Sequence, residues 1–153
     1  MRAVVQRVAW AKVEVDGEIV GQIERGLLVY LGAGKGDGDA DRAYVLSKVT
    51  GLRIFHNDAG KMDHSVVDVG GALLVVSQFT LYADLRRGRR PSFDGAMPPE
   101  DAVQAYEAFV RDARALGITV ATGKFRADMK VSSLNDGPVT IWIDSAKSAT
   151  MAP

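Results

Sequence analysis

The residues best suited to chemistry stand in a short polar segment that directly follows five apolar residues. The apolar run covers 72–76, and the polar segment reads Ser77-Gln78-Phe79-Thr80-Leu81. A buried strand with this ending would bring hydroxyl groups and an amide to a rigid sheet edge, which suits a binding or catalytic site. A Thr80 nucleophile normally needs an adjacent base, but no His or Lys lies near it in the sequence. An ordinary strand that becomes exposed at its end is the simpler interpretation of the segment taken alone.

A second segment concentrates positive charge. We call residues 86–90 the arginine loop, because it contains Arg86, Arg87, Arg89 and Arg90 around a single glycine. Arginine pairs with phosphate groups through two parallel hydrogen bonds and stacks on bases, so the loop predicts contact with a nucleic acid. Phe93, just beyond it, offers either a stacking platform or an anchor to the core. A solvated charged loop is the alternative.

A third segment places a proline and a turn inside a strand-like run, and it reads Asn135-Asp136-Gly137-Pro138-Val139-Thr140. Pro138 has no N–H group to donate to a sheet, so it must lie at an edge or in a turn. A Gly-Pro turn is usually trans and purely structural. A cis bond would instead point the carbonyl groups of Gly137 and Pro138 in the same direction, as a fixed pair of acceptors facing a ligand.

The composition excludes several other chemistries. The 153 residues contain no Cys, so a thiolate nucleophile, a zinc–thiolate site and a disulfide are excluded. The two histidines, His56 and His64, are too few for a multi-His metal site, and we interpret them as solvated loop residues. We therefore expect no metal and no cofactor. The glycine-rich segment 32–38 lacks the spacing of a phosphate-binding loop. A net charge of zero argues against a protein that coats nucleic acid non-specifically.

Apolar periodicity predicts the elements that position these segments. Strands are expected over 4–8, 12–15, 18–23, 26–31, 52–55, 72–76 running on to 81, 118–120, 129–134 and 139–143, and helices over 39–48 and from 98 to a stop at 117. The inward-facing helix residues are expected to be Ala43, Val45, Leu46 and Val49, then Val103, Tyr106, Val110 and Ala113. With no linker, signal peptide or membrane-length apolar run, we expect one mixed α/β domain over 1–153 in a soluble intracellular protein.

Taken together, the sequence resembles the D-aminoacyl-tRNA deacylase family over nearly its whole length. The resemblance rests on five motifs in order, each weak alone and specific together. They are Met1-Arg2-Ala3-Val4-Val5-Gln6-Arg7-Val8, Ser77-Gln78-Phe79-Thr80-Leu81, Arg90-Pro91-Ser92-Phe93, Gly123-Lys124-Phe125-Arg126-Ala127-Asp128-Met129 and Asn135-Asp136-Gly137-Pro138-Val139-Thr140.

This resemblance implies a homodimer with a three-layer mixed α/β fold, in which two β layers carry the helices on one side. It implies a cytoplasmic enzyme that hydrolyses the ester between a D-amino acid and the 3′ end of tRNA, as chiral proofreading in translation, and that also accepts glycyl-tRNA. The family's Gly-Pro bond is cis and reaches into the partner subunit's pocket, so Gly137 and Pro138 would exclude L-amino acids. Arg7 would hold this turn and Met129 would form pocket wall. The scissile ester would be surrounded by Ser77, Gln78, Phe79 and Thr80.

An aminoacyl ester is already activated, so modest stabilisation of the transition state would suffice. We expect backbone N–H groups near Phe79 and Thr80 to stabilise the oxyanion, and a tRNA 2′-hydroxyl to assist in place of a protein base. Two alternatives stay open: a non-catalytic tRNA- or RNA-binding adaptor dimer that uses the arginine loop, and an esterase for small D-amino-acid esters. The expected partners are a tRNA carrying a D-amino acid or glycine and a second copy of the chain, with no membrane and no DNA.

Overall fold

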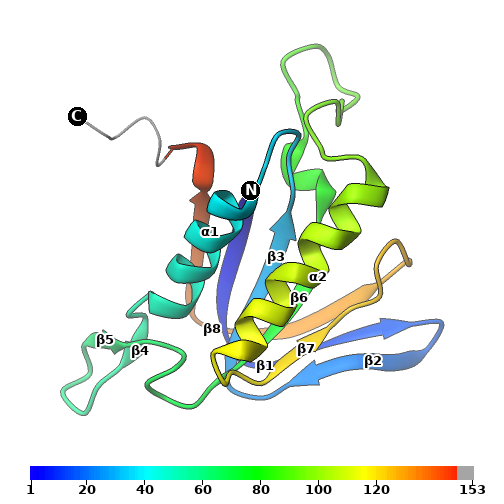
Figure 1. The fold of residues 1–153 in the computed structure, drawn as a ribbon. Helices are drawn as coiled ribbons and strands as arrows, with labels where there is room; N and C mark the ends of the chain where they lie inside the picture. The colour runs from blue at the N-terminus through cyan, green and yellow to red at the C-terminus, as the bar shows by residue number, and fades with distance from the viewer. Residues whose placement is uncertain (148–153) are drawn as a thin grey trace, which may run out of the picture.

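The computed structural model describes residues 1–147, which fold into a strand-rich sheet covered by two α-helices (Figure 1). In chain order the elements are β1 (Arg2–Val15), β2 (Glu18–Ile23), β3 (Gly26–Gly32), α1 (Asp39–Gly51), β4 (Phe55–His56), β5 (Met62–His64), β6 (Ala72–Ser77), the 3-10 helix η1 (Phe79–Tyr82), α2 (Pro99–Ala115), β7 (Val120–Thr122), β8 (Lys130–Asp144) and the 3-10 helix η2 (Ser145–Lys147). The mixed α/β class is as the sequence predicts.

Strand β1 organises the main sheet, because it is long enough to pair with three other strands. Its first half pairs antiparallel with β3, and its second half pairs antiparallel with β2 across the turn at Asp16 and Gly17. Both turn residues have positive φ (50° and 80°), as a two-residue hairpin turn requires. Strand β8 pairs antiparallel with both halves of β1. Strands β6 and β7 extend the sheet from β3 in parallel.

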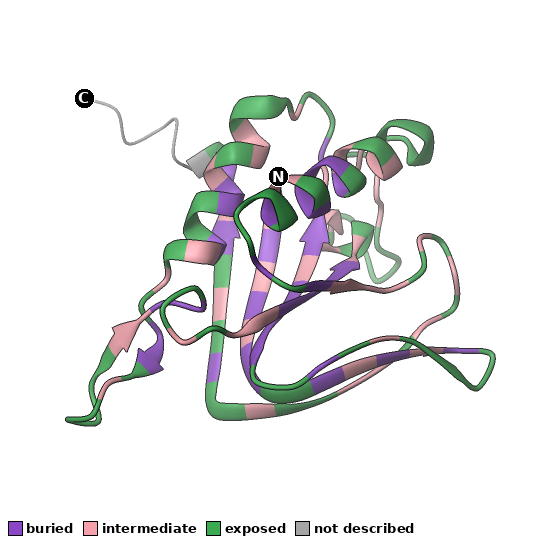
Figure 2. Ribbon diagram, turned by 60° about the horizontal axis from the view of Figure 1, so that its bottom comes forward, coloured by how far each residue is buried: buried purple, intermediate pink, exposed green. Residues whose placement is uncertain are grey.

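The core forms two clusters, one on each face of the sheet, because neighbouring strand residues point to opposite faces. Leu27 and Val29 face the helices, whereas Leu28 packs with Leu74 and Val76 on the other side. Figure 2 shows that β3 and β6 are buried along most of their length, because both of their faces are covered. The second cluster also contains residues from the far half of β1 and from β2, so the sheet folds over itself. The predicted two β layers are therefore parts of one continuous six-stranded sheet.

Both helices bury one face against the first cluster. Val45, Leu46 and Val49 of α1 are buried as predicted, but Ala43 is exposed, so that prediction was wrong. Three predicted residues of α2, Tyr106, Val110 and Ala113, are buried, and Val103 is half-buried. The sequence analysis missed Phe109, which is fully buried. Helix α2 begins after Pro98 and ends before Gly117, whose φ of 83° suits glycine at a helix stop.

One predicted strand is displaced. Residues 52–54 are not strand; β4 covers only Phe55 and His56, and it pairs with β5 inside the segment expected to be a loop. The carbonyl of Ile54 accepts a hydrogen bond from the Arg7 side chain, so this buried carbonyl has a partner although it lies outside any sheet. The strand predicted at 118–120 likewise begins at Val120. Within the described residues, no helix is long and apolar enough to cross a membrane.

Candidate active site

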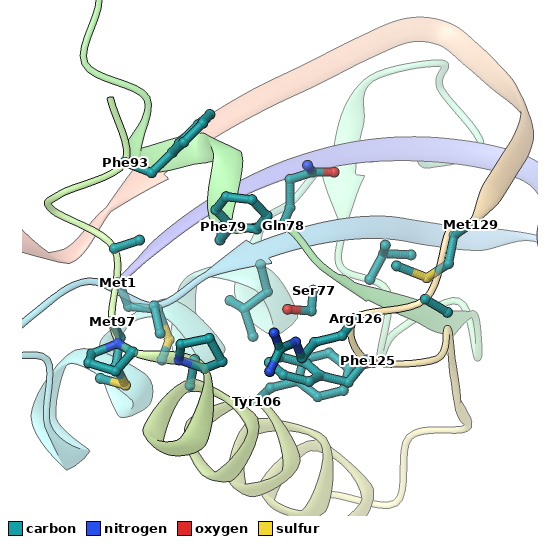
Figure 3. Close-up of a pocket in the computed structure, with 18 of the residues that line it drawn as sticks. Met1, Ser77, Gln78, Phe79, Phe93, Met97, Tyr106, Phe125, Arg126 and Met129 are labelled. Atoms are coloured by element: carbon teal, nitrogen blue, oxygen red, sulfur yellow. The ribbon is translucent and has the colours of Figure 1, made fainter. Parts of the chain in front are cut away.

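A cavity of about 740 Å³ opens beside the end of β6. Its walls come from β6, η1, the segment before α2, the first turns of α2 and the connection between β7 and β8 (Figure 3). These segments are far apart in the sequence, and the parallel pairing of β3, β6 and β7 brings them together. Ligand sites commonly lie at this end of parallel strands, where the connections leave the sheet.

The polar segment that the sequence singled out contributes Ser77, Gln78 and Phe79 to this cavity. The strand does not run on to Leu81 as predicted. Its ladder with β3 ends at Ser77 opposite Leu31, and the N–H of Gln78 makes one more bond to the Leu31 carbonyl (2.8 Å). The chain then turns into η1, which is closed by bonds such as Ala83 N–H to Thr80 carbonyl (3.0 Å). A 3-10 turn projects successive residues in different directions, whereas a strand would have alternated them.

Phe79 is the exposed aromatic group of the site. Its side chain is 55% exposed, and its ring packs edge-to-face on Phe93 with 5.0 Å between centroids. Figure 3 shows the two rings together at one side of the cavity. Phe93 therefore contributes to the cavity wall, whereas the sequence analysis left its role open between stacking platform and core anchor.

Thr80 is exposed and is not among the residues that line the cavity. Its hydroxyl accepts a hydrogen bond from the side-chain amide of Gln78. Among the hydrogen bonds of residues 1–147, none is donated by the backbone N–H of Phe79 or of Thr80. The start of η1 thus presents two adjacent backbone donors. In the hydrogen bonds of residues 1–147, the Thr80 hydroxyl has the Gln78 amide as its partner and no basic side chain.

The Gly137–Pro138 turn is built by a break in register between β1 and β8. Gln6 pairs with Thr140 and Val8 pairs with Asn135, so the four residues 136–139 lie opposite Arg7 alone and loop out of the sheet. The Gly137–Pro138 peptide bond is cis, as the resemblance implies. Both residues are exposed, and neither lines the cavity of this chain.

The side chain of Arg7 holds this turn in place. Its guanidinium is buried (3% exposed) and donates to the carbonyl groups of Ile54 (2.6 Å) and Asp136 (3.1 Å). Its Nε also lies 3.5 Å from the exposed Asp136 carboxylate. A Cβ on Gly137 would lie only 2.9 Å from the Arg7 side chain, and the φ of 130° at this position favours glycine as well. The turn therefore depends on both Gly137 and Arg7.

The arginine loop forms a small exposed hairpin whose base is closed by two backbone hydrogen bonds between Asp84 and Ser92 (2.7 and 3.1 Å). Arg86 folds back on Asp84, and this charged hydrogen bonding lowers the pKa of Asp84 to about 2. Within the described part of the chain, no ion pair engages the other three arginines of the loop. The loop does not line the cavity.

Several cavity residues were not predicted as site residues. Tyr106 was expected only as helix core, yet it lines the cavity and donates its hydroxyl to the Val75 carbonyl (2.7 Å). Burial raises the pKa of Tyr106 to about 12. Phe125 and Arg126 lie in the segment 123–129, whose resemblance to the family was the available signal. Met129 of the same segment, which the resemblance assigned to the pocket wall, also lines the cavity. His56 and His64 lie away from the cavity, and His64 is 4.0 Å from Asp68. The described residues contain no group of three or more acidic or His side chains placed to hold a metal ion.

The chain is similar to a well-defined set of proteins over almost its full length. A D-aminoacyl-tRNA deacylase of Sorangium cellulosum is 60% identical over 149 residues, which are 97% of this chain and 99% of that protein. A D-aminoacyl-tRNA deacylase of Koribacter versatilis is 57% identical over 147 residues, 96% of this chain and 99% of that protein.

Solved structures agree on the fold. One described as a c-Myc DNA Unwinding Element Binding Protein has a TM-score of 0.89 and 40% identity, and the match covers 94% of this chain and 98% of that one. Another, a probable eukaryotic D-amino acid tRNA deacylase, has a TM-score of 0.78 and 17% identity over 93% of this chain and 97% of that one, which supports the fold alone. The pattern of the family described as D-Tyr-tRNA(Tyr) deacylase matches residues 4–144. The resemblance seen in the sequence is thereby confirmed: this chain belongs to the D-Tyr-tRNA(Tyr) deacylase family.

Proposed function

We propose that this chain hydrolyses the ester that joins a D-amino acid, or glycine, to the 3′ end of tRNA, and that it does so as a cytoplasmic homodimer. Family membership and the name shared by relatives at 57–60% identity support the deacylase reaction itself. The observation that carries the proposal is the cavity at the end of β6, which Ser77, Gln78 and Phe79 line. Beside it begins η1, where no hydrogen bond of the described residues is donated by the backbone N–H of Phe79 or of Thr80.

The chemistry needs little from the side chains. Water attacks the ester carbonyl carbon, the bond to the ribose 3′ oxygen breaks, and that oxygen takes up a proton. The N–H groups of Phe79 and Thr80 stabilise the negative oxygen of the tetrahedral intermediate, a role in which one donor is commonly worth about 10²–10³ in rate. Since no basic side chain among the described residues forms a hydrogen bond with Thr80, the substrate's own 2′-hydroxyl is the proposed aid to proton transfer, and no covalent Thr80 intermediate forms.

Selection against L-amino acids is assigned to the Gly137–Pro138 turn of a second subunit. In its own chain the turn is exposed and outside the cavity, although it is firmly held by Arg7. Main-chain carbonyl groups cannot rotate away as a side chain can, so the inserted turn would clash with an L side chain. Glycine has no side chain to exclude and is accepted. Large apolar side chains on the strands that carry the turn, including Trp10, Leu134 and Trp142, are exposed and support a subunit interface there.

Arg87, Arg89 and Arg90 of the arginine loop form no ion pair within residues 1–147. We propose that they bind the tRNA backbone, because exposed arginines without acidic partners are available to phosphate groups. A second candidate function is a non-catalytic RNA-binding adaptor. It is favoured by this loop and by the 40% identity to a protein described as binding a DNA unwinding element. A third is an esterase for small D-amino-acid esters, in which the loop only aids solubility.

One experiment separates these functions. The purified protein is incubated with D-aminoacyl-tRNA and with the methyl ester of the same D-amino acid, at several salt concentrations. A deacylase cleaves the tRNA ester far faster, and salt reduces this preference. An adaptor binds tRNA without cleavage, and a small-molecule esterase cleaves both substrates alike at every salt concentration.

Mixed dimers test whether the turn acts across the interface. One subunit carries Gln78→Ala with Phe79→Ala and lacks a working cavity, and the other carries Gly137→Val and lacks a working turn. Insertion in trans predicts that the intact turn enters the intact cavity, so an excess of the first subunit suppresses cleavage of L-aminoacyl-tRNA by the second. A turn that acted within its own chain would leave that cleavage unchanged.

A further inference from the structure

The cavity contains a cation that the proposed hydrolysis does not use. Arg126 lines the cavity, and in the view of Figure 3 its guanidinium reaches in between Ser77 and the ring of Phe125. It comes from the connection between β7 and β8, on the opposite side of the cavity from the aromatic pair of Phe79 and Phe93.

Within the part of the chain that the structure describes, no carboxylate forms an ion pair with this guanidinium. Among the interactions of residues 1–147, none joins Arg126 to an acidic side chain. The nearest acid in the sequence, Asp128, is engaged by Lys130 at 3.2 Å. One acid, Asp94, lines the same cavity, and among the ion pairs of the described residues none joins it to Arg126. Arg126 is therefore available to an anion that enters with the ligand.

The backbone at Arg126 also indicates a role for its side chain. Residues Lys124 to Ala127 form a turn closed by a bond from the Ala127 N–H to the Lys124 carbonyl (3.1 Å). Arg126 occupies the third position with a φ of 66°, a conformation that favours glycine or asparagine. An arginine that keeps an unfavourable conformation in order to project into a cavity is typical of a functional position.

We infer that Arg126 binds the phosphate that links the terminal adenosine of the tRNA to the nucleotide before it. This inference rests on the proposed function, because it takes the scissile ester to lie at Ser77–Thr80. The phosphate then lies one ribose away from the ester, inside or at the mouth of the same cavity. Guanidinium matches a phosphodiester with two parallel hydrogen bonds. The contact would favour a nucleotide ester over a small ester at the first step of recognition.

The test uses a pair of stable amide analogues of D-alanyl-adenosine. One carries a 5′-methylphosphate, with the single negative charge of a tRNA linkage, and the other carries a free 5′-hydroxyl. Binding is measured by calorimetry at constant ionic strength. The wild type is expected to bind the phosphorylated analogue about 10- to 100-fold more tightly, the range of a charged hydrogen-bonded contact.

Arg126→Gly is the informative variant, because glycine accepts the positive φ and the turn should keep its shape. The two analogues should then bind with nearly equal affinity, and Arg126→Lys should recover part of the preference. Lys124→Ala is the matched control. Lys124 is a cation of the same turn but does not line the cavity, so this variant should keep the full preference for the phosphorylated analogue.

The outcomes separate this inference from the proposed function. If the preference is absent in the wild type, or survives in Arg126→Gly, the phosphate assignment is wrong whether or not the protein cleaves D-aminoacyl-tRNA. If the preference depends on Arg126 but no ester is cleaved, the phosphate site stands and the hydrolytic function fails.

Discussion

Arg7 offers the most demanding test of how the turn is held. Its buried guanidinium donates to the carbonyl groups of Ile54 and Asp136, and a hydrogen bond to a charged group contributes about 1.5–3 kcal/mol. Arg7→Met keeps most of the side-chain bulk and removes both bonds, so the free energy of unfolding should fall by about 3–6 kcal/mol. Arg7→Lys keeps the charge but not the planar fork, so the free energy of unfolding should fall by about half as much, roughly 1.5–3 kcal/mol.

Urea denaturation of the variants measures these changes. Asp136→Asn is the control, because it removes only an exposed carboxylate (62% exposed) and leaves the Asp136 carbonyl in place. Its cost should stay below about 1 kcal/mol. In Arg7→Lys, which is expected to fold, a looser turn should also increase cleavage of L-aminoacyl-tRNA relative to the D form. The reasoning is refuted if the free energy of unfolding of Arg7→Met lies within about 1 kcal/mol of the wild-type value. It is also refuted if Asp136→Asn lowers the free energy of unfolding as much as Arg7→Met does.

Three further predictions follow from the site. Thr80→Ala should keep the deacylation rate within about tenfold of the wild type, because the proposed donors are backbone groups; a drop of about 10³-fold or more in single-turnover rate with normal binding would restore a hydroxyl role. Tyr106 has a pKa of about 12 in the folded chain and near 10 when unfolded, so its contribution to stability is full below pH 10 and disappears as the pH rises through about 12. The stability difference between the wild type and Tyr106→Phe should accordingly shrink by about 1.4 kcal/mol per pH unit across that window, and a constant difference would contradict the assignment. Replacing the three unpaired arginines of the arginine loop by alanine should reduce the slope of log Kd for tRNA against log salt by about 0.7 for each arginine that binds a phosphate group in the wild type, whereas Arg86→Ala should change it little.

The sequence predicts most of the fold because local patterns specify most of it. The hairpin at Asp16–Gly17, the buried strand before Ser77 and the stop of α2 at Gly117 follow from turn chemistry and periodicity. One of the errors occurs where a residue far away in the sequence determines the local backbone structure. Residues 52–54 have a strand-like composition, yet the Ile54 carbonyl is engaged by Arg7, 47 positions away. Ala43 has the right spacing for the core but lies on the exposed side of α1.

The site was predicted less completely than the fold. Composition and spacing identified the segment at Ser77–Leu81, but not that it turns into a 3-10 helix and leaves the Thr80 side chain outside the cavity. The periodicity of α2 explains why Tyr106 is buried, but the same pattern cannot show that its helix borders a cavity. Nothing in the sequence predicted the positive φ of Arg126, because arginine rarely adopts this conformation.

The most direct test of the central claim is the ratio of single-turnover deacylation rates for the same tRNA charged with the D and the L form of one amino acid. Selection by an inserted main-chain turn predicts a D-over-L ratio above roughly 200, beyond what one hydrophobic contact provides. The glycyl form of a tRNA should be cleaved as the D form is. Equal cleavage of the D and L esters, or cleavage of neither, would contradict the account.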